Sequence, residues 1–588
     1  MISASPRHLC IQATFASALM LTAAFPVSAS TLYIPTSNHP DDAATSCFEV
    51  KTIKIDGFQD VAKENQIEGI VKPIALACQD NESVSAILKA VNGFLSERGY
   101  VTTQAWLPEQ NIAESRELLV QIVPGRIDRV EYVEVRADQQ GRLSKLFRGK
   151  TARAERIKSP ETVLGRISAW FESLDDDLDN FTILGPNVRI AVAKTVKPGD
   201  ILTMDEVQNT VDSLNRVPSN KAKAELKPGE KPATSTVVIQ NTIKDTFRLY
   251  AGYDTENVQG FDQLRFGLTL EKDNLLGVNE TWRATAKTGL YSNELSGAFA
   301  IPIGNLNFRL NGTWSDSLVN LSDLAEFYST TRTFSAGGDW TLSAAKDHKL
   351  IADFDLQRRE LLRYINGTPL TPQVLAQIRL GLSYSQYFGN SSISGRAGGS
   401  FGLNAFGANE DFSDPTGTVP RAQFSKFEGS LSAEHVIPNI ASLNSVLSGQ
   451  FTNDVLYSDD QLTLGSRSSV RGYSGGNSKV DSGAIWRNEV GFALSSFPLP
   501  SKEDHPVWLR DLTSRTNLYV FGDLGAGYDN ANKRTPYRIS AGAGVRYAAS
   551  RLSFDVGYGF RLAEDRTASI VMSPDRGELF FNLRFKAL

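Results

Sequence analysis

The sequence contains few of the residue types that catalysis and metal binding most often use. Its 588 residues include only five histidines, three cysteines and four methionines. No phosphate-cradling loop and no nucleophile elbow are present. These absences argue against an enzyme and predict neither a cofactor nor a metal site. The histidines are scattered, without the spacing of metal ligands, at His8, His39, His348, His435 and His505.

Long apolar runs are missing beyond the N-terminal segment. Residues 9–25 are largely apolar, Arg7 and His8 precede them, and the small residues Val27-Ser28-Ala29 follow. This order predicts a secretory signal peptide over residues 1–29, cleaved after Ala29. A membrane anchor is the alternative, but the stretch falls short of the ~20 apolar residues that a spanning helix needs.

Cysteine is nearly absent, and cleavage of the signal would remove Cys10. The remaining pair, Cys47 and Cys78, would reach an oxidising compartment, so we expect a disulfide between them. Such a bridge closes a loop of roughly 30 residues and contributes about 3 to 4 kcal/mol by the loop-entropy estimate. Two free thiols are the alternative, and a metal site is disfavoured because further ligands are lacking nearby.

Charge and length set broad limits. Charged residues make up 22% of the chain and the formal net charge is -5, without the basic module that nucleic-acid binding requires. The length predicts two to four folding units. Low overall hydropathy does not exclude a membrane protein, because a transmembrane β-strand turns only one face to lipid.

Residues 47–126 have the pattern of a small α+β domain with the order strand, helix, helix, strand, strand. An extended start through Phe48 and Ile55 ends at the turn Asp56-Gly57. Apolar residues from 84 to 95 fall on one helical face, with Asn81 as the expected cap and Gly99 as the end. Two β-rich runs follow at 100–106 and 118–123.

Residues 127–243 repeat this order at greater length. We expect a strand at 130–135, a helix at 161–174, and a second helix that begins with Thr203 and Glu206 at capping-box spacing. Val207, Val211 and Leu214 lie on one face of that helix. The closing strands are expected at 222–226 and 235–240. The extra length surrounds Asp175, Asp176, Asp177 and Asp179, where we expect a solvated acidic insertion rather than a calcium site.

From residue 244 to residue 588, strict alternation of apolar and polar residues replaces helical periodicity. Leu552, Phe554 and Val556 alternate with Ser553 and Asp555, and residues 579–586 repeat this pattern. A soluble β-sandwich also alternates, but the signal peptide and segments near ~10 residues favour strands that cross a bilayer. At roughly 20 residues per strand and connection, this length predicts an antiparallel transmembrane barrel of about 16 strands.

Several short motifs, spread over nearly the whole chain, carry a resemblance to a known family. The sequence resembles the transporter component of two-partner secretion, the haemolysin secretion/activation (TpsB) type within the superfamily of outer-membrane assembly barrels. The resemblance implies that the two small domains are POTRA modules. The motifs are Cys47-Phe48 with Ile53, Gly99-Tyr100-Val101-Thr102-Thr103, Val123-Pro124-Gly125-Arg126-Ile127, residues 212–219, Pro228-Gly229 with Ser235, Asp273-Asn274-Leu275-Leu276-Gly277, Leu464-Gly465, Val470-Arg471-Gly472-Tyr473 and Phe521-Gly522-Asp523-Leu524-Gly525.

The sequence departs from the family pattern at both ends of this region. Members often carry an N-terminal plug helix, yet residues 30–46 contain Pro35 and Pro40, so we expect a linker there. The chain ends in Leu588, where such barrels usually end in an aromatic residue.

Two of the motifs define a candidate site. The Val470-Arg471-Gly472-Tyr473 motif resembles the tip of a long loop folded into the barrel, held by a strand bearing Phe521, Asp523 and Gly525. These three share one face of the strand, and a charge facing lipid would be costly, so that face is the lumen. We therefore expect a bidentate Arg471–Asp523 salt bridge, with Gly472 allowing close backbone approach. Two unrelated lumen charges are the alternative.

The resemblance implies an outer-membrane translocator of a Gram-negative cell. Its periplasmic modules would capture an unfolded client by strand addition, and the lumen would conduct it to the surface without nucleotide hydrolysis. Expected partners are a secreted client protein (TpsA-like), outer-membrane lipid and the barrel-assembly machinery during biogenesis. An insertase for other barrels is the first alternative, although it usually has more modules. A passive diffusion pore is the second, and would leave about 200 N-terminal residues unexplained.

Overall fold

The computed structural model describes residues 31–36, 48–75, 77–136, 196–255, 264–322, 325–345, 347–412, 416–473, 478–497, 507–565 and 577–587. It separates into two compact units, Met1–Gly125 and Arg126–Leu588, which are described in turn. The signal peptide, Cys47, the helix expected at 161–174 and the acidic residues 175–179 lie outside the described residues, as does the side chain of Cys78, so the Cys47–Cys78 disulfide stays a prediction.

The first unit is an α+β module built on a four-stranded sheet, beside which β2 and β4 form a separate two-stranded sheet. The sheet has the strand order β1-β3-β6-β5, with β3 and β6 parallel. Ile53, Ile87 and Leu118 are fully buried between the sheet and its helices. The elements are β1 (Leu32–Pro35), β2 (Phe48–Glu49), β3 (Thr52–Asp56), α1 (Glu64–Val71), β4 (Cys78–Gln79), α2 (Asn81–Glu97), β5 (Gln104–Trp106), α3 (Ile112–Ser115) and β6 (Glu117–Val123).

Local details of this module differ from the sequence-based expectations. Asp80, not Asn81, caps α2, because its carboxylate accepts hydrogen bonds from the backbone N–H groups of Glu82 and Ser83 at 3.1 and 2.8 Å. β5 is shorter than expected, since Gly99 has a φ of +83° and residues 100–103 form a turn. Residues 32–35, expected in a linker, form β1 and bury Leu32 and Ile34.

The second unit begins with a second α+β module, residues 126–243. Its strands β7 (Arg126–Arg136), β8 (Asn220–Pro228) and β9 (Thr234–Ile243) form a sheet in the order β7-β9-β8. Helix α7 (Met204–Asn215) buries Val207, Val211 and Leu214 against this sheet, as its periodicity predicted. Thr203 caps the helix and accepts a 3.4 Å hydrogen bond from the Glu206 N–H.

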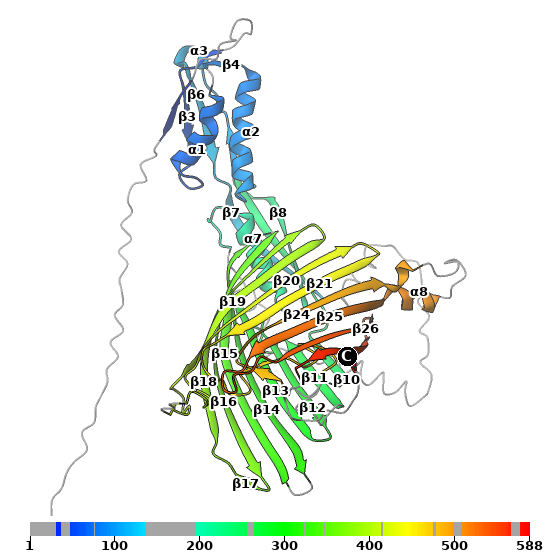
Figure 1. Cartoon of the computed structure of the whole chain (residues 1–588). Helices are drawn as coiled ribbons and strands as arrows, with labels where there is room; N and C mark the ends of the chain where they lie inside the picture. The colour runs from blue at the N-terminus through cyan, green and yellow to red at the C-terminus, as the bar shows by residue number, and fades with distance from the viewer. Residues whose placement is uncertain are drawn as a thin grey trace, which may run out of the picture. The chain divides into compact units, whose positions relative to one another are not determined.

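The rest of the second unit is a closed antiparallel barrel, which confirms the predicted fold class (Figure 1). Sixteen strands of eight residues or more form its wall, and β10 pairs with β28 to close it. The wall consists of β10 (Phe247–Asp254), β11 (Arg265–Asp273), β12 (Thr281–Gly289), β13 (Ser292–Ile303), β14 (Leu306–Ser322), β15 (Ala325–Ala344), β16 (His348–Ile365), β18 (Gln373–Phe388), β19 (Ser391–Leu403), β20 (Ser425–Ile437), β21 (Ala441–Phe451), β24 (Ser482–Ala493), β25 (Thr516–Tyr528), β26 (Tyr537–Ala548), β27 (Leu552–Glu564) and β28 (Gly577–Lys586).

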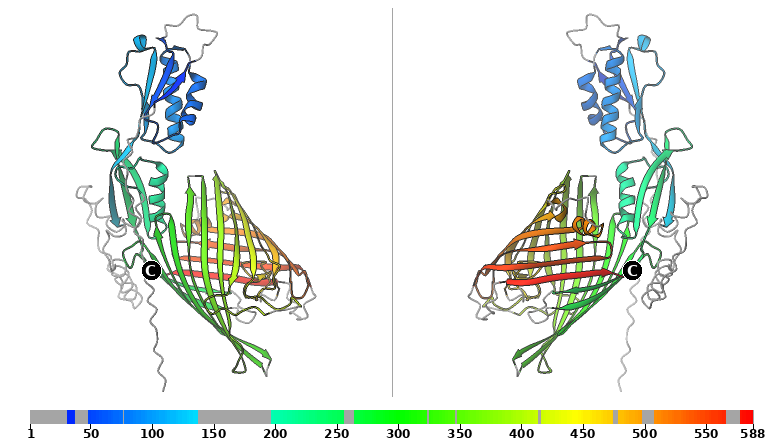
Figure 2. Two further views of the ribbon diagram at one scale, coloured as in Figure 1. Left: turned by 90° about the vertical axis from the view of Figure 1, so that its left-hand side faces the viewer. Right: turned by 90° about the vertical axis from the view of Figure 1, so that its right-hand side faces the viewer.

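Figure 2 shows the antiparallel strands of the barrel wall from two sides. Side chains of the wall alternate between the outside and the interior. On β25, Val520 and Leu524 are 48% and 39% exposed, whereas Phe521 and Asp523 between them are 5% and 2% exposed. Leu579, Leu583 and Phe585 of β28 are exposed in the same way. An apolar outer surface therefore surrounds a polar interior, as strands facing lipid require. Among the described residues, no helix combines the length and apolar character needed to cross a membrane.

Candidate functional site

The connection between β21 and β24 folds into the barrel interior. It carries the short strands β22 (Leu462–Thr463) and β23 (Lys479–Val480), which pair with each other. Asp460 pairs with Arg359 of β16, while Arg471 pairs with Asp523 of β25. Because these two contacts reach well-separated wall strands, the connection spans the lumen. We call residues 452–473 and 478–481 the inner loop and residues 470–473 its tip.

Apolar packing seats the inner loop as part of the barrel core. Leu464, Val470, Tyr473 and Val480 of the loop form a buried cluster with Ile485 of β24. Burying each such side chain contributes about 1.5 to 3 kcal/mol relative to leaving it in water. The loop is therefore held by packing in addition to its charged contacts.

Arg471 is the most extensively bonded residue of the tip. Its Nε and Nη2 donate to the two carboxylate oxygens of Asp523 at 2.7 and 2.8 Å, and its backbone N–H donates to the same carboxylate at 3.1 Å. Nη1 donates to Glu489 of β24 at 2.7 Å. The guanidinium also lies 3.7 Å from the ring centroid of Phe521, a cation–π distance.

The Arg471–Asp523 ion pair is buried, so the tip stays in place only while both charged side chains are present. The side chains of Arg471 and Asp523 are 5% and 0% exposed. Removing one member of a buried pair leaves the other without a partner and costs about 3 to 5 kcal/mol. The carboxylate of Glu489 also forms a 3.0 Å salt bridge with Arg546 of β26.

Gly472 and Tyr473 fit the tip against β26 and β27. Gly472 has a φ of +87°, and a Cβ there would lie 2.6 Å from the Gly559 carbonyl oxygen, so only glycine fits. The Tyr473 hydroxyl lies 3.0 Å from Ile539 O and 2.7 Å from Ala563 O, the strand pair where the β26–β27 register shifts. Its single hydrogen can satisfy one of these carbonyls at a time.

The structure brings together the two motifs singled out in the sequence. Val470 packs close to Gly525, where an added Cβ would lie 2.8 Å from the valine Cγ2. Sequence reasoning missed Glu489, Arg546 and Arg561, the last of which donates from Nε to the Gly472 carbonyl at 2.8 Å. A signal existed on β24, because Arg487 and Glu489 alternate with the outward-facing Trp486.

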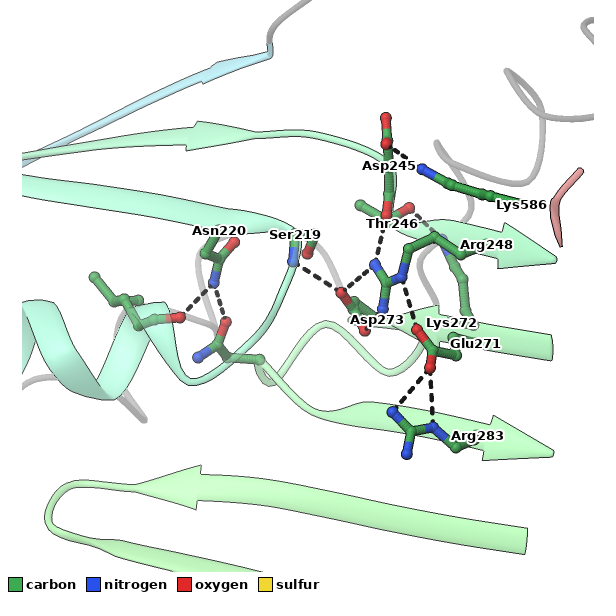
Figure 3. A network of polar contacts seen from close by, with 12 residues as sticks. Ser219, Asn220, Asp245, Thr246, Arg248, Glu271, Lys272, Asp273, Arg283 and Lys586 are labelled. Atoms are coloured by element: carbon green, nitrogen blue, oxygen red, sulfur yellow. Dashed lines mark hydrogen bonds and ion pairs between the residues drawn. The ribbon is translucent and has the colours of Figure 1, made fainter. Parts of the chain in front are cut away.

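A second polar centre joins the second module to one end of the barrel, where β10 begins (Figure 3). Asp273, at the end of β11, accepts hydrogen bonds from Arg248 Nη1 and Nη2 at 2.8 and 3.0 Å. The same carboxylate accepts from the backbone N–H of Ser219, in the turn between α7 and β8, at 3.0 Å. Arg248 Nε also donates to Glu271 at 2.8 Å. One carboxylate thus links module and barrel.

Further contacts extend this junction. Asn220 donates to Asn279 Oδ1 at 2.7 Å, and Arg216 donates to Thr341 Oγ1 at 2.7 Å. Partial burial lowers the pKa of Arg216 from its ordinary value. Lys586, near the end of β28, pairs with Asp245 at 2.5 Å. The turn motif noted in the sequence, residues 273–277, therefore lies at the module–barrel junction.

The interior contains a polar cavity of about 660 Å³ beside the inner loop, between residues 457–459 and strands β11–β16. Arg265, Lys287, Asp316 and Arg363 are among its lining residues. Within the described part of the chain, no cluster of three or more histidine, cysteine or acidic side chains is arranged to hold a metal ion.

Comparison with known proteins identifies both parts of this architecture. The family model "Haemolysin secretion/activation protein ShlB/FhaC/HecB" matches residues 233–547, more than half of the chain, and "POTRA domain, ShlB-type" matches residues 48–125. The outer membrane transporter CdiB of Dickeya dadantii (strain 3937) is 23% identical over 470 residues, which cover 77% of this chain and 74% of that protein. The hemolysin transporter protein ShlB of Serratia marcescens is 23% identical over 386 residues, 63% and 66% of the two chains.

Solved structures share the fold. CdiB from Escherichia coli superimposes with a TM-score of 0.74 at 18% identity, covering 94% of this chain and 92% of that one. CdiB from Acinetobacter baumannii gives a TM-score of 0.66 at 15% identity, covering 92% and 90%. With its outer-membrane barrel, inner loop and periplasmic POTRA modules, the chain belongs to the haemolysin secretion/activation family, ShlB/FhaC/HecB, of two-partner secretion transporters.

Proposed function

We propose that this outer-membrane transporter exports one large secreted client, which its POTRA modules receive unfolded in the periplasm and its lumen conducts to the cell surface. The observation that carries the proposal is the seated inner loop. A loop anchored to well-separated wall strands by Asp460 and Arg471 obstructs the interior of the barrel. Passage of a polypeptide then requires this loop to shift, and its contacts set the cost of the shift.

The junction at Asp273 supports delivery of the client to the barrel. Asp273 and Asn279 of the barrel bond directly to the Ser219 and Asn220 segment of the second module. A client bound to this module is therefore held next to the end of the barrel before it enters the lumen, rather than free in the periplasm. No step calls for nucleotide hydrolysis, because strand addition and diffusion through the lumen need no chemical reaction. We infer that the protein is not an enzyme.

Two further partners follow from the architecture. The exposed apolar residues of the wall, such as Leu524 and Phe585, would face outer-membrane lipid. A barrel of this kind also needs the barrel-assembly machinery to enter the membrane, and the outward-facing residues of β28 are the segment we expect it to recognise.

Deletion of the gene tests the proposal directly. We expect the neighbouring reading frame to encode a large protein with a β-helical N-terminal secretion region. Deleting the transporter gene should retain that protein in the cell, and a plasmid copy should restore its release into the medium. Unchanged release without the transporter would refute the proposal, and ion conductance with no dependent client would point to a diffusion pore instead.

A further inference from the structure

The outer face of the barrel wall carries a polar pair on strands β21 and β24. Arg487 and Glu489 of β24 point into the lumen, where they contact the inner loop, so Asn488 between them points outward to lipid. Ser445 of β21 lies directly opposite Asn488 in the register and shares its face. The apolar residues that surround this pair on the outer face are Leu443, Leu447, Val490, Val520 and Leu524. The pair is therefore an exception on a surface that faces hydrocarbon.

A chain of hydrogen bonds fixes how the side-chain amide of Asn488 is turned. The ring N–H of Trp486 can only donate, and its Nε1 lies 2.9 Å from Ser445 Oγ. The single hydroxyl hydrogen of Ser445 therefore goes to Asn488 Oδ1, at 2.8 Å. No described residue accepts a hydrogen bond from Asn488 Nδ2. A donor that faces hydrocarbon without an acceptor is costly, so the site calls for an acceptor from outside the chain.

A groove of about 380 Å³ with a mostly apolar lining lies beside this amide on the same wall. Its volume is within the range of roughly 300 to 1,000 Å³ that small-molecule sites occupy. The register places Asn488 level with Ala433 of β20, and His435 two residues nearer to the end of the barrel. His435 contacts Ser391, whose Oγ lies 2.8 Å from the ring Nδ1. Residues that line the groove include Phe388, Ile393, Ala433, His435, Asn488 and Val490.

The groove lies toward the end of the barrel that faces the periplasm. Arg216 of the second module, a periplasmic module, donates from Nη2 to the carbonyl of Asn305 in the β13–β14 turn at 3.5 Å. Successive turns of an antiparallel barrel alternate between its two ends, so the β18–β19 and β20–β21 turns lie at the same end as this one. His435 is two residues from the end of β20 that enters the second of these turns. The leaflet at that end of an outer membrane consists of glycerophospholipid, whereas lipopolysaccharide occupies the opposite leaflet.

We propose that this groove binds one glycerophospholipid of the periplasmic leaflet, and that an ester carbonyl of the lipid accepts a hydrogen bond from Asn488 Nδ2. The headgroup lies beside His435, and an acyl chain fills the apolar part of the groove. Two residues of a strand span about 7 Å, so Asn488 lies below His435 as an ester group lies below a phosphate. The inference does not depend on the proposed export function, because it concerns the lipid-facing wall alone.

Native mass spectrometry of the full-length protein in detergent tests the site. The probe is dioleoylphosphatidylethanolamine, added in increasing amounts. We expect the wild type to bind one probe molecule, and Asn488→Leu to bind it at least tenfold more weakly, because leucine has a similar size but no donor. Asn488→Gln keeps both donor hydrogens and should stay within threefold of the wild-type affinity.

Filling the groove tests its apolar part. Ala433→Phe should weaken probe binding at least tenfold, because the ring occupies the space of the acyl chain. The matched control is Ala286→Phe, which places the same ring at an exposed alanine of β12, opposite the outward-facing Leu295. This control should bind the probe like the wild type. Heat-modifiable migration in gels confirms that each variant is a folded barrel.

Two further lipids test the chemistry of the contact. An ether-linked analogue of the probe lacks the ester carbonyls, so it should bind the wild type at least tenfold more weakly than the probe does. Asn488→Leu should bind the two lipids equally, because the variant has already lost the hydrogen bond. Lipid A, the anchor of lipopolysaccharide, should bind the wild type at least tenfold more weakly than the probe.

Three results would overturn the proposal. The first is a wild-type protein that retains no probe, and the second is equal affinity of the wild type and Asn488→Leu. The third is a preference of the wild type for lipid A or equal binding of the ether analogue. Loss of probe binding in both Asn488→Leu and Ala433→Phe, with Asn488→Gln and Ala286→Phe unaffected, supports the site.

Discussion

Replacing Arg471 with alanine should release the tip of the inner loop while leaving the barrel closed. The substitution removes three side-chain hydrogen bonds, two of them to Asp523, whose side chain is 0% exposed. Only the backbone N–H of residue 471 can still donate to that carboxylate. The cost of leaving that carboxylate buried without its cation is about 3 to 5 kcal/mol. The wall keeps its sixteen-strand hydrogen-bond ladder, because Arg471 contributes nothing to it.

Arg467 provides a matched control within the same loop. Its guanidinium pairs with Asp555 at 3.2 Å, but the two side chains are 28% and 20% exposed. A solvated pair of this kind contributes up to about 1 kcal/mol. Arg467→Ala should therefore leave the tip seated, although it removes the same charge from the same segment.

External protease on intact cells reports the position of the loop, and heat-modifiable migration in gels reports barrel closure. We expect Arg471→Ala to expose the inner loop to cleavage and to abolish client release, while the barrel still migrates as a folded species. Arg471→Lys should be intermediate, because an ammonium keeps the charge without the two-pronged contact. A protease-resistant loop with normal release in Arg471→Ala would refute the reasoning.

Three further changes test other parts of the molecule. Asp273→Asn should weaken the module–barrel junction by about 3 to 5 kcal/mol, because Arg248 loses a buried partner; thermal unfolding should show the loss, whereas Arg283→Gln, at a side chain 60% exposed, should change little. Leu524→Arg should destabilise the barrel by about 2 to 4 kcal/mol by placing a cation on the lipid face, measurable by urea unfolding in lipid vesicles; equal stability would contradict the orientation of β25. Hydrogen bonds from Ser83 lower the pKa of Asp80, so its stabilisation of α2 is complete above the usual aspartate pKa of about 3.9 and is lost as the pH falls through the lowered value. Asp80→Ala should therefore lower the first module's melting temperature at pH 7 and not at strongly acidic pH.

Features that depend on short-range periodicity could be predicted from the sequence. Alternation identified the barrel and the shared face of Phe521, Asp523 and Gly525, because neighbouring side chains of a strand point to opposite sides. The length of the alternating region gave the approximate strand number. Residues three and four positions apart lie on the same face of a helix, and this period placed Val207, Val211 and Leu214 against a core. The N-cap of α2 was predicted only to within one residue, since aspartate and asparagine both suit that position. The backbone path at the start of the helix decides between Asp80 and Asn81.

Features that depend on which distant segments meet required the tertiary structure. No local pattern shows that Glu489 and Arg546 complete the surroundings of Arg471, because the contact depends on the register of three strands and the path of the loop. The same holds for β1, which pairs with β3 and so closes one edge of the sheet of the first module. The sequence determined which face each residue occupies; the fold decided which faces meet, because contacts between residues far apart in the chain are set by packing and pairing of whole elements.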